Sequence, residues 1–438
     1  MNDAAPPLNP LLLRNARLLD PASGRDEMGA VLVAEGKIAA IGRQIPRAVA
    51  TDIDCKGACL APGLVDMRVQ LREPGAEHME NMVSASRAAA AGGVTTMAAL
   101  PNTLPPIDDV SLVDFVARRA RDIGLVNIHT YAALTKGLGG RELTEMGLLA
   151  EAGALGFTDA VHAVSDALVM RRALSYARTF GLLVIQHPEE PKLAAGGAMN
   201  EGEMATRLGL PGITPAAEVM MVERDLRLVE ITLGRYHAAH VSTGAAIEAI
   251  RRAKARGLPV TCDTAPPYFA LNETAVGEYR TFAKLSPPLR SEIDRRAVVE
   301  GLGDGTIDAI ASDHAPHDQD SKRLPFTSAA SGIIGLETLL PLSLALYHNR
   351  HMPLLRLVEA LTVAPAKILG LPAGRLDVGA PADLVVFDLE RPWRIDVDAF
   401  RSKSKNAPFD GRPVQGHALM TIVGGRVVFS HETFGGGP

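Results

Sequence analysis

Apolar and polar residues follow different patterns at the two ends of the chain and in its middle. Residues 30–34 and 37–42 are apolar runs of strand length separated by Glu-Gly, which predicts a β-hairpin. Near the C-terminus, residues 382–388 predict one strand, and residues 419–423 and 426–429 predict a second hairpin around Gly-Gly. Neither end carries enough apolar side chains to fold alone. We therefore expect both ends to pair into one small β domain.

The middle of the chain alternates between short apolar runs and segments of helical periodicity. The strand-like runs lie near residues 62–70, 94–100, 127–132, 154–158, 182–187, 236–241, 258–263 and 307–313. Helical patterns separate most of them, at residues 108–123, 141–152, 165–180, 215–233, 244–256 and 292–303. This alternation predicts an α/β fold, a (β/α)₈ TIM barrel. A doubly wound open sheet is the alternative, weakened because no Gly-x-Gly-x-x-Gly follows the first strand.

These patterns divide the chain into two domains. We expect residues 1–60 and 375–438 to form the small domain, a β-sandwich built from both chain termini. Residues 61–374 then form the barrel. Two long loops, residues 188–213 after the fifth strand and residues 314–334 after the eighth, are placed where they could cover a site.

Composition narrows the classes of partner. The chain has 438 residues, a formal net charge of −5 and no long run of like charges, which argues against nucleic acid or an anionic membrane surface. No uninterrupted apolar run is long enough to span a membrane. The three cysteines are too few for a zinc clamp of their own and fit buried thiols in a reducing cytoplasm. Apolar helix faces allow a homo-oligomer.

Polar residues gather where the expected strands end, and in barrels this edge carries the chemistry. In chain order they are Arg68, Gln70, Arg72, Asn102, Asp159, His187, His237, His240, Asp313, His314 and His317. Asp313 is the strongest single candidate for a functional residue, because a carboxylate after an apolar strand suits a general base or a metal ligand.

Structural interpretations stand beside the functional ones. His187 could be a core histidine bonded to a backbone carbonyl, and Asp159 could cap the next helix. The pair Glu189-Glu190 could simply be solvated. His237 and His240 are three residues apart, so on one strand they point to opposite faces and only one can face the barrel interior.

Several motifs together resemble the dihydroorotases of the amidohydrolase superfamily, from about residue 10 to about residue 430. They are Pro-Gly-Leu-Val-Asp at 62–66, Leu-Arg-Glu-Pro-Gly at 71–75, Ala-Gly-Gly-Val-Thr-Thr at 91–96, Pro-Asn-Thr at 101–103, His-Val-Ser-Thr at 240–243, Ser-Pro-Pro-Leu-Arg at 286–290, Ser-Asp-His-Ala-Pro-His at 312–317, Gly-Leu-Glu-Thr at 335–338 and Gly-Ala-Pro-Ala-Asp-Leu at 379–384. The resemblance implies a (β/α)₈ barrel, a small β domain, and zinc-assisted opening or closing of the dihydroorotate ring in pyrimidine synthesis.

The resemblance also implies roles for individual residues. Arg72, Asn102 and His317 match positions that bind the substrate carboxylate, for which an arginine is well suited. His187 and His240 match the pair that holds the second metal, and Asp313 matches the aspartate that binds metal and moves the proton. Asp159 falls where the family supplies a carboxylate after the fourth strand.

The departures from the family pattern concentrate on the metal. The family's His-x-His is here Arg68-x-Gln70, and an arginine has no lone pair to offer. The usual second acid after Asp159 is Ala160, the usual asparagine before Pro-Pro-Leu-Arg is Ser286, and the usual Pro-His-His is Pro-Pro-Tyr at 266–268. We therefore expect at most one zinc ion, held by Asp159, His187 and His240, or none.

Arg68 suggests a replacement for the lost ion. Its guanidinium is expected to pair with Asp313, which would offset the burial of that carboxylate. Such a pair would also lower the pKa of Asp313 and make it a poorer base. The hypothesis requires that Arg68 and Asp313 lie within salt-bridge distance.

Two classes of function remain open at this point. The first is a dihydroorotase-type cyclic amide hydrolase that interconverts carbamoyl-aspartate and dihydroorotate with one zinc ion or none. The second is a non-catalytic dihydroorotase-like partner of aspartate transcarbamoylase. An amidohydrolase for another cyclic imide or ureide, such as hydantoin or allantoin, is disfavoured because the carboxylate-binding Arg72 and Asn102 are both present.

Overall fold

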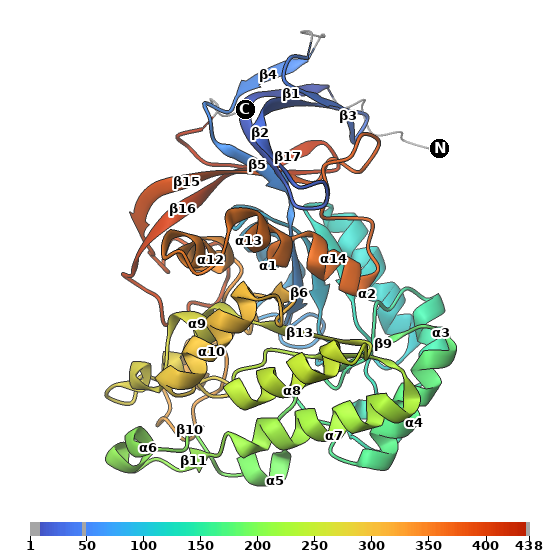
Figure 1. The fold of residues 1–438 in the computed structure, drawn as a ribbon, viewed down its shortest axis with the longest axis vertical. Coiled ribbons are helices and arrows are strands. Elements are labelled where there is room, and N and C mark those ends of the chain that lie inside the picture. The colour runs from blue at the N-terminus through green and yellow to red at the C-terminus, as the bar shows by residue number, and fades with distance from the viewer. Residues whose placement is uncertain (1–8, 46–49, 435–438) are drawn as a thin grey trace.

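The fold was examined in a computed structural model that describes residues 9–45 and 50–434. Three segments of the expected small domain, residues 1–8, 46–49 and 435–438, lie outside the described residues. Within them the chain forms a β layer above a group of helices and parallel strands (Figure 1).

Strands from both ends of the chain share one sheet of eight strands. Its order is β17-β16-β15-β5-β1-β2-β3, and β4 pairs with β1. The strands are β1 (Leu11–Asp20), β2 (Arg25–Ala34), β3 (Lys37–Gly42), β4 (Thr51–Asp54), β5 (Cys59–Pro62), β15 (Leu384–Arg394), β16 (Pro413–Val423) and β17 (Arg426–Ser430). The two ends meet where β15 pairs antiparallel with β5. Both expected hairpins, β2–β3 and β16–β17, are confirmed.

This sheet has an apolar cluster of its own. Leu13, Val31 and Leu60 from the N-terminal strands pack with Leu384 and Ile422 from the C-terminal ones, and all are fully buried. Because each end supplies only part of the cluster, burial of apolar surface favours the folded sheet only when both ends are present.

The middle of the chain forms two parallel sheets. One is β6-β7-β8 and the other is β14-β13-β12-β9. Their strands are β6 (Leu64–Val69), β7 (Val94–Ala99), β8 (Asn127–Thr130), β9 (Leu183–Gln186), β12 (Arg235–Ala238), β13 (Val260–Thr264) and β14 (Ala309–Ile310). Single bridges connect the two sheets, from Val69 to His314 on one side and through Phe157 to Ala132 and Val184 on the other.

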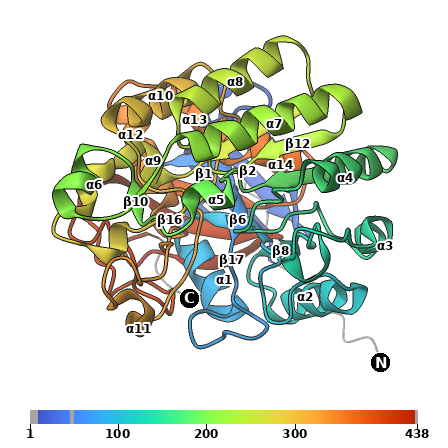
Figure 2. The ribbon, with the colours of Figure 1, turned by 90° about the horizontal axis from the view of Figure 1, so that it is seen from below.

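Helices surround these strands. Figure 2 shows α1, α2, α4, α8 and α10 around β6 and β8. The α-helices are α1 (Met82–Ala91), α2 (Val110–Ile123), α3 (Met146–Glu151), α4 (Ala167–Thr179), α7 (Ala216–Thr232), α8 (Gly244–Ala255), α9 (Pro266–Ala270), α10 (Glu292–Gly303), α12 (Leu339–His348), α13 (Leu354–Leu361) and α14 (Val363–Leu369), with short 3₁₀ turns at Lys136–Leu138, Glu273–Val276 and Thr281–Ala283. Side-chain caps begin several of them: Asp109 accepts from the Ser111 amide at α2, and Asp166 from the Leu168 and Val169 amides at α4.

The two long loops carry short elements of their own. Residues 188–213 contain α5 (Pro191–Ala194), β10 (Met199–Asn200), α6 (Glu203–Leu208) and β11 (Gly212–Ile213). Residues 314–334 contain α11 (Gln319–Lys322). Among the described residues, every helix is too short or too polar to cross a membrane.

Candidate active site

Arg68 lies on strand β6 with its side chain buried among the strand ends. It is 2% exposed. Its Nε donates to Asp313 Oδ1 at 2.8 Å, and one of its terminal nitrogens donates to the Ala160 carbonyl at 3.3 Å. The expected pair between Arg68 and Asp313 is therefore confirmed. The guanidinium therefore lies between Asp313, which follows strand β14, and Ala160, the position at which the resembled family has a second acid.

Asp313 stands in a left-handed turn just after strand β14, with φ of 50°. Its second oxygen lies 3.2 Å from His240 Nδ1. Burial by itself would raise the pKa of Asp313, but His240 and Arg68 together hold that pKa well below its ordinary value. A carboxylate held in its charged form in this way is a weak proton acceptor, as the sequence hypothesis required.

His240 and His187 contact each other directly. His187 Nδ1 lies 2.7 Å from His240 Nε2, and Ser286 Oγ lies 3.3 Å from His187 Nε2. Burial and the nearby charge on Arg68 together lower the pKa of His240 to about 4, so the ring is neutral at pH 7. The residues form a continuous polar row from Arg68 through Asp313, His240 and His187 to Ser286.

His237 is not part of this row. Its Nε2 lies 2.9 Å from Asp263 Oδ2 and its Nδ1 lies 2.8 Å from Thr261 Oγ1, both on the neighbouring strand β13. His240 lies beyond the end of β12, at φ of 38°. The expectation that only one of the two histidines reaches the site holds, although they do not share one strand as assumed.

Asp159 points to a different neighbour. Both of its carboxylate oxygens accept hydrogen bonds from Thr135, one from the backbone amide at 2.9 Å and one from the hydroxyl. No hydrogen bond connects Asp159 with His187 or His240 among the described residues. No group of three or more histidine, cysteine or acidic side chains suited to a metal ion occurs in residues 9–45 and 50–434.

The residues expected to bind a carboxylate lie along one edge of the site. Arg72 donates from Nε to the Pro316 carbonyl at 3.0 Å, and its terminal nitrogen lies 3.3 Å from His317 Nε2. Asn102 donates to Gln70 Oε1 at 3.0 Å. Burial and the charge on Arg72 together lower the pKa of His317 to about 4, so the ring is neutral at pH 7. His317 Nε2 also lies 2.9 Å from the Ser331 carbonyl, to which it must donate, so its proximity to Arg72 is a contact and not a hydrogen bond. Arg72, His317 and the pair Asn102–Gln70 are thereby held in place.

Sequence reasoning missed Glu189. Its solvated interpretation is wrong: the side chain is 11% exposed, and Oε1 accepts from Ser286 at 3.2 Å. Its Oε2 is buried without a hydrogen-bond partner among the described residues. Its neighbour Glu190 caps α5 by accepting from the Leu193 amide. A departure from the family pattern at Ser286 was the available signal, since Ser286 is the residue that contacts Glu189.

Zinc does not fit the side chains of this site. A catalytic zinc needs three protein ligands with free lone pairs and one open position. Arg68 supplies a permanent cation beside Asp313, and no third histidine, cysteine or acidic side chain suited to a metal joins His187 and His240 among the described residues.

Asp66, two residues before Arg68 on strand β6, offers a separate test of the electrostatics of the site. Its Oδ1 accepts the amides of Arg68 and Ser312, both at 3.1 Å, while Oδ2 is buried without a partner among the described residues. Burial raises the pKa of Asp66 to about 6, so ionising it disfavours the folded state as pH rises from about 4 through 6.

Replacing Asp66 by asparagine is accordingly expected to stabilise the protein at high pH. At pH 8 the free energy of unfolding should rise by about 2 kcal/mol, and at pH 4 it should hardly change. Urea unfolding at both pH values measures the difference. An equal effect at pH 4 and pH 8 would show that charge is not the cause.

Comparisons with known proteins agree with the resemblance seen in the sequence motifs. Residues 57–246 match the family described as dihydro-orotase-like, and residues 309–429 match the amidohydrolase family. The dihydroorotase of Anaplasma phagocytophilum (strain HZ) is 48% identical over 425 residues, 95% of each chain. That of Syntrophotalea carbinolica is 47% identical over 419 residues, 96% of this chain and 99% of the relative. The L-hydantoinase (dihydropyrimidinase) structure from Arthrobacter aurescens has a TM-score of 0.85 at 28% identity and covers 97% of this chain and 96% of its own.

Proposed function

Because the chain belongs to the dihydroorotase family, we propose that it acts as a dihydroorotase of pyrimidine biosynthesis, on the pair dihydroorotate and carbamoyl-aspartate. The family membership rests on relatives 46–48% identical over nearly the whole chain. The similarity to hydantoinase structures supports, in addition, a closed (β/α)₈ barrel, with the single bridges at Val69–His314 and at Phe157 completing the ring.

One observation supports a carboxylate ligand most directly. The half-buried Arg72 has no carboxylate within salt-bridge distance among the described residues, and burial lowers its pKa to about 10 although the more distant charge of Asp318 acts in the opposite direction. A guanidinium out of water without a counter-ion is unfavourable, and the carboxylate of either ligand would supply that ion. Asn102 and His317 lie beside the same edge and are positioned to add hydrogen bonds.

Binding of carbamoyl-aspartate by calorimetry tests this assignment. Arg72→Gln should weaken binding roughly 10- to 150-fold, the range for a lost hydrogen bond to a charged group. Arg375→Gln is the matched control, because Arg375 is half exposed and its ion pair with Asp377 lies at the surface. Equal affinity in the Arg72 variant and the parent would contradict the assignment.

Because the side chains of the site are poorly suited to zinc, the zinc content of the protein is expected to be low. We propose that the chain binds less than one zinc ion and that turnover of dihydroorotate does not respond to added zinc or to a chelator. Elemental analysis of the purified protein and a hydrolysis assay with and without zinc measure both quantities. Two ions per chain, with activity lost on chelation, would overturn the proposal.

A second candidate function is favoured by the Arg68–Asp313 pair. Because this pair holds the family's acid-base aspartate as a weak base, the chain also suits a non-catalytic partner of aspartate transcarbamoylase. Sedimentation velocity of the two proteins, alone and mixed, tests for a complex. Zinc-independent turnover without complex formation favours the enzyme, and a complex without turnover favours the partner.

A further inference from the structure

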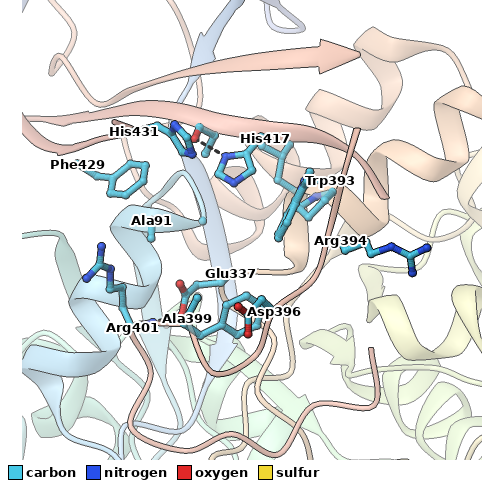
Figure 3. Close-up of a pocket in the computed structure, with 15 residues that line it drawn as sticks. Ala91, Glu337, Trp393, Arg394, Asp396, Ala399, Arg401, His417, Phe429 and His431 are labelled. Atoms are coloured by element: carbon cyan, nitrogen blue, oxygen red, sulfur yellow. Dashed lines mark hydrogen bonds between the residues drawn. The ribbon is translucent and has the colours of Figure 1, made fainter. Parts of the chain in front are cut away.

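A cavity of about 270 Å³ lies between the terminal sheet and the helices, away from the candidate active site, with which it shares no lining residue. It is enclosed by the end of α1, the start of α12, strands β15, β16 and β17, and residues 396–401. Figure 3 shows its side chains converging from above and below. A cavity of this size suits a ligand at the small end of the range for bound metabolites.

Aromatic rings form much of its wall. The rings of Trp393 and His417 are 4.7 Å apart between centroids, and those of His417 and His431 are also 4.7 Å apart. Trp393 donates from Nε1 to the Gly416 carbonyl at 2.9 Å, which fixes the indole. Phe429 completes the group on the other side in Figure 3. A wall of fixed rings favours a flat ligand that stacks.

Two polar atoms of the cavity can accept hydrogen bonds from a ligand, one on Glu337 and one on His417. Glu337 Oε1 accepts the amides of Arg401 and Ser402 at 2.7 and 3.2 Å, while its Oε2 has no hydrogen bond among the described residues. Burial raises the pKa of Glu337 to about 7, so Oε2 is an acceptor in the charged form that predominates above pH 7, and a donor on the ligand favours that form. His417 Nδ1 lies 2.8 Å from the Ala418 carbonyl and must donate to it, so Nε2 of the neutral ring carries a lone pair. Burial lowers the pKa of His417 and keeps the ring neutral. The complementary ligand therefore brings N–H donors.

Two cations line the cavity, Arg394 and Arg401. The side chain of Arg401 is exposed and forms no hydrogen bond or ion pair within the part of the chain that the structure describes, although its charge acts on Glu337. Arg394 lies on the opposite side in Figure 3 and donates to the Gly411 carbonyl at 3.0 Å. Arg401 is thus the group available to an anionic substituent of the ligand.

We propose that this cavity binds a nucleotide whose base carries an exocyclic amine. The base stacks against Trp393 and His417, its amine donates to Glu337 Oε2 and His417 Nε2, and its phosphate pairs with Arg401. An apolar ligand would leave the Glu337 carboxylate without a partner, and a simple anion would leave the aromatic wall without a contact.

The experiment uses the fact that Trp393 is the single tryptophan of the chain, so intrinsic fluorescence reports on this cavity alone. The full-length protein is titrated with two matched pairs, CMP against UMP and AMP against IMP, and with ribose 5-phosphate, exciting at the red edge of the tryptophan band. We expect saturable quenching by CMP or AMP, at least tenfold weaker binding of its partner without the amine, and none by ribose 5-phosphate. Equal binding of both members, or no saturable binding, would overturn the proposal.

Variants locate the site. Glu337→Gln keeps an oxygen for the two backbone amides and replaces the free acceptor by a donor, so affinity for the amine-bearing nucleotide should fall about tenfold. Trp393→Leu, followed by calorimetry, should cost about tenfold through lost stacking. Arg401→Ala should weaken the nucleotide but not its nucleoside, and Arg375→Ala should change neither. Nucleotide binding unaltered in all three cavity variants would contradict the assignment.

Discussion

Replacing Arg68 by methionine should lower the free energy of unfolding by about 3–5 kcal/mol, the cost of removing one partner of a buried ion pair. Asp313 is only 9% exposed and would lose its 2.8 Å bond to the guanidinium Nε. Methionine is chosen because it retains much of the length and apolar contact of the arginine stem. Urea unfolding at pH 7 measures the change.

A double-mutant cycle separates the pair from the packing. Asp313→Asn alone should also destabilise the protein, because it leaves Arg68 buried without a counter-ion. The double variant should cost clearly less than the sum of the two single changes, since neither charge is then left alone. Strictly additive effects, or a loss below about 1 kcal/mol for Arg68→Met, would show that the pair does not organise the site.

The second large effect concerns zinc. The double variant Arg68→His/Gln70→His should bind one zinc ion per chain, where the parent binds less. Position 68 lies on strand β6 and position 70 directly follows the last residue of that strand, Val69, so two side chains that alternate along this direction are expected to project together. Asp313 lies beside position 68. Two imidazoles and a carboxylate form a ligand set that catalytic zinc sites use. Elemental analysis after dialysis gives the stoichiometry.

Two further variants sharpen that result. Arg68→Met/Gln70→Met removes the same polar groups without adding ligands and should remain without zinc. In the histidine variant, dihydroorotate hydrolysis should rise with zinc loading if the two histidine ligands were the only groups missing. Zinc binding without any turnover would indicate that Ala160, in place of the family's second acid, is also limiting, and Ala160→Asp is the next change. Failure to bind zinc would contradict the placement of positions 68 and 70.

Local pattern was sufficient to predict most elements of the barrel. The apolar run at 94–100 and the helical pattern at 292–303 correspond to β7 and α10 within a residue or two. Burial of one face imposes the period of each element, so the pattern is written in the sequence itself. At 154–158 the expected strand is reduced to bridges at Phe157. Helices α1 and α12 were missed because one is rich in alanine and serine and the other is apolar on nearly every side, with a proline inside.

What the sequence determined by itself was which residues reach the site: a cation at 68, an amide at 70, histidines at 187 and 240 and an acid at 313. Only the tertiary structure decided how they are used, because their partners are distant in the chain. Arg68 and Asp313 are 245 residues apart, and Ser286 and Glu189 are 97 apart. Asp159 has the residue type of a ligand, and its two oxygens accept hydrogen bonds from Thr135, which is 24 residues away in the chain. Side-chain periodicity records which face is buried, whereas hydrogen bonding depends on distances and directions that exist only once the strands are assembled.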